Sequence, residues 1–302
     1  MFTPTELFTN QNGVDFFGYI FAMTKMPSEM TLRQLHTLED YQACVALQKE
    51  TWGENFSECV PPAILMVAQK VGGVTAGAFD DSGKLLGFVF GLTGVKEGRL
   101  VHWSHMLAVR EELRGQGLGK RLKLYQRELL LDLGIEVVYW TYDPLVARNA
   151  HLNLNKLAAK IHEYVPNMYI EDTGSELHSG VGMDRFVVEW FITDDRVRQV
   201  ILGQMPTVEC NSAQAPVVNT KLREDGRSIP MEGELPAVPA VRVEIPFDIH
   251  KIQSESLELA VQWRASTRRA FLWYLDKEYK VETFYREAES DRCFYVLTVK
   301  VV

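Results

Sequence analysis

A glycine-rich turn between an apolar strand and a basic helix is the feature that most restricts the folds open to this 302-residue chain. The stretch LRGQGLGKRLK, residues 113–123, has glycines at positions 115, 117 and 119 and then turns basic. It is not a P-loop, because Lys120 is followed by arginine rather than by serine or threonine. It is not the dinucleotide fingerprint, because the spacing is GxGxG rather than GxGxxG. The pattern that is left after these exclusions is Arg-x-x-Gly-x-Gly, and it lies between a predicted strand and a predicted helix.

Such a turn suits a pyrophosphate group. Glycines let the backbone approach a ligand closely and turn its N–H groups inward. The unpaired N–H groups of the first helical turn add the positive end of the helix dipole, worth only about 0.3–1 kcal/mol in exposed sites, so several N–H bonds must act together. Arg114, Lys120, Arg121 and Lys123 supply the densest basic cluster of the sequence. The alternative interpretation is a tight turn followed by an ordinary solvated basic face.

The charge and the cysteines exclude several other classes of protein. The formal net charge is −8, which argues against nucleic acid as the main partner. The four cysteines form no CxxC pair, so we expect no metal site, no disulfide framework and a cytoplasmic setting. The apolar run at residues 14–23 contains Asp15, follows no basic residue and is too short to span a bilayer. We therefore expect no membrane association.

The hydrophobic periodicity predicts the element order β-α-α-β-β-β-α-β-α-β-β over residues 30–195. In this reading residues 145–165 are one helix, and residues 167–172 begin a closing antiparallel pair. The predicted fold class is α/β with mixed α+β character: a mixed central sheet flanked by helices. Residues 1–29 are expected to be an N-terminal extension, 196–240 a proline-rich linker or arm, and 241–302 a β-α-β-β subdomain that packs against the first domain or a partner subunit.

The stretch HMLAVREELRGQGLGKRLK, residues 105–123, resembles the acetyl-CoA-binding motif of the GNAT superfamily of N-acetyltransferases. The element order over about residues 30–192 is similar to the order of that fold. Residues 140–159, WTYDPLVARNAHLNLNKLAA, and 183–190, MDRFVVEW, resemble an uncharacterised bacterial group of predicted GNAT acetyltransferases. The resemblance implies a metal-independent acyltransferase that moves an acetyl or other small acyl group from acyl-CoA to the amine of a small molecule. The tail resembles a second half of a GNAT domain, expected to complete the sheet or to cover the acceptor pocket.

The same resemblance implies the residues that bind the co-substrate. The backbone of two strand residues would bind the pantetheine arm, the glycine turn would bind the pyrophosphate, and Asn149 would open the helix beside the co-substrate. The two central parallel strands would separate near this point. The predicted co-substrate residues are Leu107, Val109, Arg114, Gly115, Gln116, Gly117, Leu118, Gly119, Lys120 and Asn149.

His105 is the candidate general base. Strand periodicity places it on the same face as Leu107 and Val109, and some GNAT members resemble this sequence in having a base histidine on the same strand. The alternative is a strand histidine that bonds a neighbouring carbonyl. His102 is expected to point the other way.

The general acid departs from the family pattern. The common helix motif has a tyrosine where this sequence has Leu154, and Ala158 replaces the usual glycine. The flanking asparagines cannot release a proton at neutral pH. Water, or a hydroxyl such as Tyr142 or Tyr164, is the remaining candidate.

Two other functions stay open at this point. The missing tyrosine favours a non-catalytic acyl-CoA-binding or sensing protein. A scaffold that forms a homodimer through the C-terminal half-domain is the second alternative.

Overall fold

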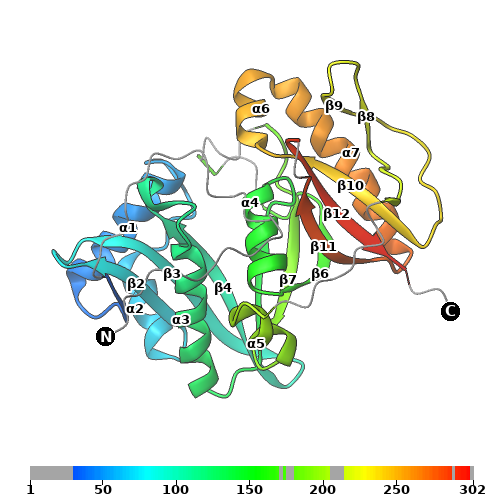
Figure 1. The fold of residues 1–302 in the computed structure, drawn as a ribbon. Coiled ribbons are helices and arrows are strands. Elements are labelled where there is room, and N and C mark those ends of the chain that lie inside the picture. Colours follow the sequence, from blue (N-terminus) through cyan, green and yellow to red (C-terminus); the bar gives the residue numbers. More distant parts are fainter. Residues whose placement is uncertain (1–29, 170–172, 175–179, 205–213, 288–289, 300–302) are drawn as a thin grey trace, which may run out of the picture.

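The computed structural model describes residues 30–169, 173–174, 180–204, 214–287 and 290–299 (Figure 1), so the predicted extension 1–29 lies outside the described residues. The first half of the main domain contains β1 (Met30–Gln34), α1 (Leu38–Trp52), α2 (Pro62–Lys70), β2 (Val74–Asp80), β3 (Leu85–Lys96), β4 (Arg99–Val109) and α3 (Leu118–Asp132). The second half contains β5 (Val137–Tyr142), α4 (Ala147–Ala150), a π-helical segment (His151–Lys156), β6 (Lys160–Val165) and β7 (Arg185–Phe191). The predicted order of helices and strands is confirmed.

The seven strands of this domain form one mixed sheet in the order β1-β2-β3-β4-β5-β7-β6. Neighbours are antiparallel except β4 and β5, which are parallel. Helices α1 and α2 pack on one face of the first half and enclose a core of their own. Helices α3 and α4 cover the opposite face, so the sheet is sandwiched between helices (Figure 1).

The end of the second half differs from the predicted helix at 145–165. Helical structure stops at Lys156, Ala158 has a left-handed φ of 55°, and residues 160–165 pair with β7 as an edge strand. A left-handed residue cannot continue a right-handed helix, so the chain reverses there. The strand predicted at 167–172 is displaced accordingly, and its residues 170–172 lie outside the described ones.

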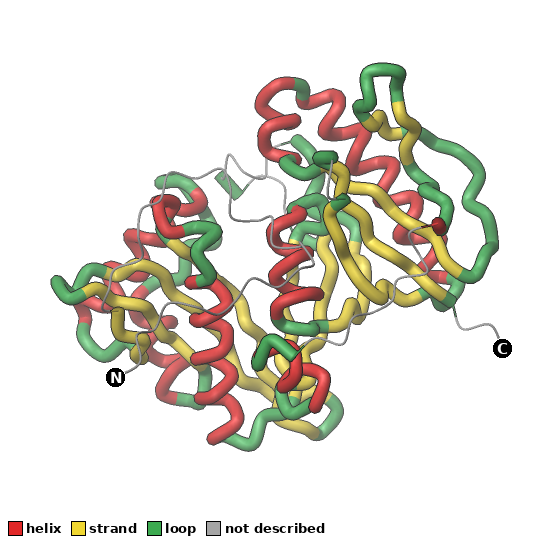
Figure 2. Tube along the Cα trace, in the orientation of Figure 1, coloured by secondary structure: helices red, strands yellow, loops and turns green. Residues whose placement is uncertain are grey.

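The C-terminal part forms a second, smaller sheet. After α5 (Asp195–Ile201) and a short hairpin of β8 (Thr220–Leu222) and β9 (Ser228–Pro230), the chain forms β10 (Ala240–Pro246), α6 (Ile249–Glu255), α7 (Leu257–Asp276), β11 (Lys280–Arg286) and β12 (Arg292–Thr298). The strand order β10-β12-β11 repeats the order β5-β7-β6 of the main sheet, each with its helical segment after the first strand. Figure 2 shows these strands and α7 as a separate layer. The expectation that the tail completes the main sheet is therefore wrong, since it builds its own.

The two sheets share one core. Phe186 of β7, Phe271 of α7 and Tyr295 of β12 pack together, with ring centroids 4.7 Å apart for the two phenylalanines and 5.4 Å for Phe271 and Tyr295. All three side chains are fully buried. The tail thus packs against the second half of the main domain, as expected. None of the described helices is long and apolar enough to cross a membrane.

Candidate functional site

The sheet opens between its two parallel strands. β4 and β5 pair at two positions, His102 with Val138 and Trp103 with Tyr139. Beyond them β4 continues beside β3, and β5 beside β7, without pairing with each other. The resulting fork is the strand separation that the GNAT resemblance implies, and it leaves backbone groups of both strands without a strand partner.

The predicted strand residues turn their backbone toward this fork. The N–H of Arg110 donates to the carbonyl of Leu86 on β3, at 3.0 Å. Residues of an antiparallel strand alternate in the side to which they direct their backbone groups. Leu107 and Val109 therefore direct theirs away from β3, toward β5. The carbonyl of Val109 accepts a bond from Nε of Arg114, so the N–H groups are the freer part of this edge.

His105 is the extra residue of a β-bulge in β4. Ser104 lies opposite Gly91 and Met106 opposite Phe90, which leaves His105 without a cross-strand partner. A bulge of this kind interrupts the alternation of side chains and bends the strand. It lies at the start of the open stretch of β4.

The bulge changes the face on which His105 lies. Its ring packs edge-on against Phe90, with centroids 6.0 Å apart, and Phe90 belongs to the core under α1 and α2. Leu107 and Val109 pack against the core on the α3 side. The prediction that His105 shares a face with these two residues is therefore wrong, because periodicity does not continue through a bulge. His105 is exposed at the surface, so the desolvation that lowers its pKa is partial, and the carboxylate of Glu58 acts in the opposite direction.

The glycine turn is open toward solvent. Gly115 and Gly117 have left-handed φ values of 79° and 85°, and a Cβ at either would meet no atom within 4 Å. A Cβ on Gly119 would lie 3.7 Å from a methyl of Leu107 and 3.9 Å from one of Leu152. The turn therefore lies where α3, β4 and the helical segment after β5 converge.

The helix that follows has a free N-terminus. α3 begins after Gly117, its first turn contains no acidic residue, and no side chain caps it. Leu118 is buried and anchors this turn in the core. The side-chain amide of Gln116 donates to the carbonyl of Glu112 at 2.9 Å, a hydrogen bond within the turn itself. Lys120 lies in the first turn, where burial and then Lys156 lower its pKa.

Asn149 lies inside helix α4 rather than at its start. The helix begins at Ala147, and the N–H of Asn149 donates to the carbonyl of Val146 at 2.9 Å. The sequence resemblance predicts Asn149 as the first residue of this helix, but the helix begins two residues earlier, at Ala147.

His102 is confirmed on the opposite face from His105, within a buried hydrogen-bond chain. The hydroxyl of Thr93 donates to the carbonyl of Gly72 at 2.6 Å, so it accepts from Nδ1 of His102 at 3.0 Å. Nε2 of His102 then accepts from the amide of Gln126, also at 3.0 Å. Both ring nitrogens are used by a neutral imidazole. Burial, with help from Lys123, lowers the pKa of His102 to about 3.

Lys123 is buried at the base of the fork and extends this chain. Its Nζ donates to the hydroxyl of Ser104 at 2.7 Å and lies 3.8 Å from the ring centroid of Trp140. Ser104 and Trp140 are the first residues beyond the last β4–β5 pair. Burial lowers the pKa of Lys123 well below its usual value. Lys123 therefore lies in the protein interior, unlike the rest of the basic cluster that follows the glycine turn.

The predicted acids lie away from the fork. The hydroxyl of Tyr142 accepts from Tyr295 of the C-terminal sheet at 3.3 Å, and burial raises the pKa of Tyr142. Tyr164 donates its hydroxyl to Asp184 in a short hydrogen bond, and burial raises its pKa as well. Neither geometry supports proton donation at the fork.

The Leu154 position faces the C-terminal sheet. Its side chain lines a groove of about 1570 Å³ between β6, α7 and β11, rather than the glycine turn. Asn153 accepts from the indole of Trp140 at 3.1 Å, and Asn155 donates to the carbonyl of Phe284 at 2.8 Å. These asparagines fix the π-helical segment between the two sheets.

Tyr169, which the sequence analysis did not single out, lies at the open stretch of β5. The hydroxyl of Tyr169 and that of Thr141 are 3.1 Å apart. Arg185 at the start of β7 places its guanidinium over the Tyr169 ring, 5.5 Å from the centroid. Tyr169 follows an irregular connection, so no periodic pattern in the sequence points to it.

Comparison with known proteins agrees with this geometry. Residues 41–153 match the acetyltransferase (GNAT) family model, and this part of the chain is a GNAT acetyltransferase domain. No curated protein matches the chain.

Several solved structures have a low similarity to this chain. They include the NatC complex bound to Gag peptide and CoA (17% identity, TM-score 0.43, 54% of this chain and 98% of that chain). The ribosomal-protein-S18-alanine N-acetyltransferase of Escherichia coli is 17% identical, with a TM-score of 0.41 over 54% of this chain and 94% of that one. A GNAT acetyltransferase of Streptococcus pneumoniae is 18% identical, with a TM-score of 0.43 over 53% of this chain and 98% of that one. At these values the family assignment rests on the sequence match.

Acetyl-CoA is the co-substrate of this family, and the described residues fit it. The open glycine turn and the free N-terminus of α3 offer N–H groups to a pyrophosphate. The fork offers the edge of β4 to an extended amide-bearing arm, in the manner of an added strand. No group of three or more residues in the described part of the chain could hold a metal ion.

Proposed function

We propose that this protein transfers an acetyl or other small acyl group from acyl-CoA to the amine of a small molecule. The observation that carries the proposal is the fork between β4 and β5, which opens beside the free N-terminus of α3 and has His105 as the second residue of its open stretch on β4. A strand edge, an anion-binding turn and a candidate base thus converge on one place.

The chemistry requires a neutral amine, a positioned thioester and a proton for the departing thiolate. The amine nitrogen forms a bond to the thioester carbonyl carbon, and the carbon–sulfur bond then breaks. His105 would accept the proton of the amine, directly or through water. Its lowered pKa keeps the imidazole neutral at pH 7, the form that a general base needs.

For the thiolate, Tyr169 is the better candidate acid than Tyr142. Its hydroxyl lies beside Thr141 on the open stretch of β5, whereas the Tyr142 hydroxyl faces the C-terminal sheet. Thr141 alternates with the inward-facing Trp140 and so lies on the same side of the sheet as His105. The acceptor amine would then approach from the face that carries α1 and α2.

A thiol-release assay across a panel of amines tests the proposal. We expect acetyl-CoA turnover whose kcat/KM rises with pH and levels off above the pKa of His105, with a midpoint below 6.5 because partial desolvation lowers that pKa. Deprotonation of the acceptor amine adds a second rise at higher pH. The variant His105→Gln should lose about 100-fold in kcat/KM and lack the first rise, while it binds acetyl-CoA like the wild type.

A protein that binds acetyl-CoA but releases no thiol with any amine would contradict the transfer reaction. It would instead indicate the sensing role. An unchanged pH profile in His105→Gln would remove His105 from the mechanism and leave the function standing.

A further inference from the structure

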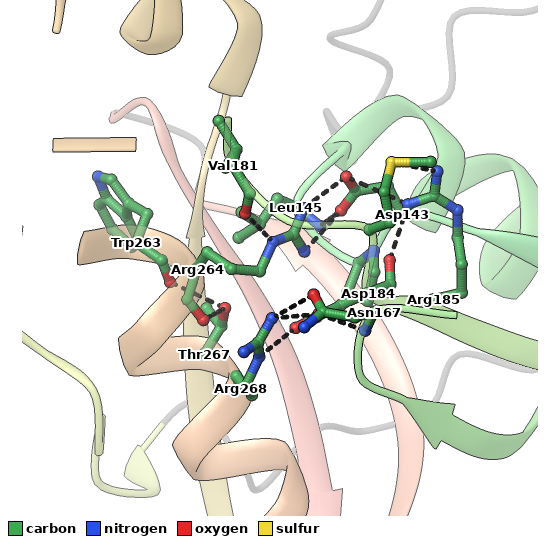
Figure 3. Close-up of polar contacts among 12 residues, drawn as sticks. Asp143, Leu145, Asn167, Val181, Asp184, Arg185, Trp263, Arg264, Thr267 and Arg268 are labelled. Atoms are coloured by element: carbon green, nitrogen blue, oxygen red, sulfur yellow. Dashed lines mark hydrogen bonds and ion pairs between the residues drawn. The ribbon is translucent and has the colours of Figure 1, made fainter. Parts of the chain in front are cut away.

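Three arginines and two aspartates meet where β5 ends, β7 begins and α7 crosses them (Figure 3). Asp143 directly follows β5, Asp184 directly precedes β7, and Arg185 is the first residue of β7. Arg264 and Arg268 reach the same place from α7, so the network joins the main domain to the C-terminal sheet.

Two of the arginines have a carboxylate each. Arg264 donates to both oxygens of Asp143, at 2.9 and 2.6 Å. Arg268 donates to both oxygens of Asp184, at 2.8 and 2.5 Å. Burial disfavours ionisation of both aspartates, but the guanidinium groups outweigh it and lower their pKa values. These are two complete bidentate pairs.

The third arginine has no such partner among the described residues. The Arg185 side chain is 8% exposed, and its nearest carboxylate oxygen, on Asp143, is 3.8 Å away. Among the described residues, its guanidinium donates hydrogen bonds to the backbone carbonyl of Asp184 at 2.9 Å and to the sulfur of Met183 at 3.6 Å. Thioether sulfur is a weak acceptor. Burial lowers the pKa of Arg185, and Asp143 only partly opposes this.

Among the described residues of this network, three arginines and two aspartates leave one unit of positive charge. A buried charge is costly unless it is closely paired and hydrogen-bonded. Arg185 has one carboxylate contact among the described residues, at 3.8 Å, so its guanidinium can still accept a ligand that completes the pairing. One positive charge matches a carboxylate, whereas a phosphate would bring up to two negative charges. The fixed fork of guanidinium donors also matches the two oxygens of a carboxylate.

The position of Arg185 connects this charge to the acceptor side of the fork. Its guanidinium lies over Tyr169, whose hydroxyl is beside Thr141 on the open stretch of β5. Phe186, the next residue along β7, faces the shared core, so Arg185 faces the opposite side of the sheet. That is the side on which His105 lies.

We propose that Arg185 binds a carboxylate of the acceptor, so that the acceptor is a small molecule with a free amine and a carboxylate, such as an amino acid. This inference rests on the proposed acyl transfer. The bond to the sulfur of Met183 is the contact that the carboxylate would displace. Asp143 and Arg264 then position Arg185 rather than touch the acceptor.

The wild-type protein provides the first test, without any substitution. L-amino acids, their amides and the corresponding decarboxylated amines are compared as acceptors in the thiol-release assay. We expect kcat/KM to be about 10- to 100-fold higher for the free carboxylates than for the matched amides, mainly through KM. Equal rates for all three series would overturn the inference but would leave acyl transfer established.

Variants of the network provide the second test. Arg185→Gln should lose the preference for carboxylates and Arg185→Lys should keep part of it, with the affinity for acetyl-CoA unchanged in calorimetry. The control is Arg268→Gln, which breaks the neighbouring bidentate pair and should keep the preference. A preference retained by a folded Arg185→Gln protein would overturn the inference, and the wild-type comparison decides it if that variant does not fold. Phosphorylated amines that compete better than carboxylates would also overturn it.

Discussion

At the scale of single residues, the neutral state of His102 is imposed by its partners. Thr93 has already donated its proton to a carbonyl, and Gln126 presents its amide N–H to Nε2. A protonated ring would bring a second N–H against that amide donor, in a site where Lys123 is close. The buried chain therefore stabilises the base of the fork only while His102 is uncharged.

This predicts a specific sensitivity to acid. The folded pKa of about 3 lies below the usual 6.5, so between these values the unfolded chain binds a proton that the folded chain does not. Stability is then lost as the pH falls from 6.5 toward 3, by about 3 kcal/mol at pH 4 from this residue alone. Denaturant titrations at pH 7 and pH 4 should show a smaller loss for His102→Gln than for the wild type. Equal losses would show that His102 titrates normally in the folded protein.

At the scale of elements, the sequence predicts the order of helices and strands, but not the two irregularities that shape the site. The glycine spacing and the strand before it predict the turn and the free helix end, and the resemblance to the GNAT fold implies the fork. The bulge at His105 cannot be predicted from periodicity, because Ser104 and His105 are both polar and residues 106–109 are all apolar, so there is no alternation that a bulge would interrupt. The early end of the helix after β5 was missed for a related reason: an alanine occupies the left-handed position where a glycine would have signalled the stop.

The strained alanine gives a matched pair of variants. Ala158 and Ala150 are both buried, but Ala158 has a φ of 55° and Ala150 a helical φ of −56°. A glycine at either position loses a buried methyl group and gains unfolded-state entropy, whereas relief of left-handed strain, about 1–2 kcal/mol, applies at 158 alone. Ala158→Gly should therefore cost about 1–2 kcal/mol less in the free energy of unfolding than Ala150→Gly. Equal costs in denaturant titrations would contradict the strain.

At the scale of the whole molecule, the C-terminal sheet repeats the strand order of the second half of the main domain and completes its polar network. Arg264 lies 121 positions after its partner Asp143 in the sequence. No local pattern predicts such a pair, since Arg264 sits in a helix that otherwise reads as amphipathic. The sequence therefore predicts the conformation of the glycine turn well and the polar network at the end of β5 poorly, because the first is one continuous stretch and the second is assembled from distant segments.

The proposed acyl transfer requires the turn at residues 115–120 to bind the pyrophosphate of an acyl-CoA. Calorimetric titration of acetyl-CoA into the wild type, Gly119→Asn and Gly119→Asp tests it most directly. Asparagine and aspartate have similar size, and a Cβ at position 119 would make only ordinary van der Waals contacts. The helix dipole stabilises a carboxylate in the first turn of α3. Gly119→Asp should thus fold at least as stably as Gly119→Asn but bind acetyl-CoA about 10-fold more weakly, because its charge repels the pyrophosphate. Equal affinities of the two variants, or no binding by the wild type at millimolar acetyl-CoA, would contradict the account.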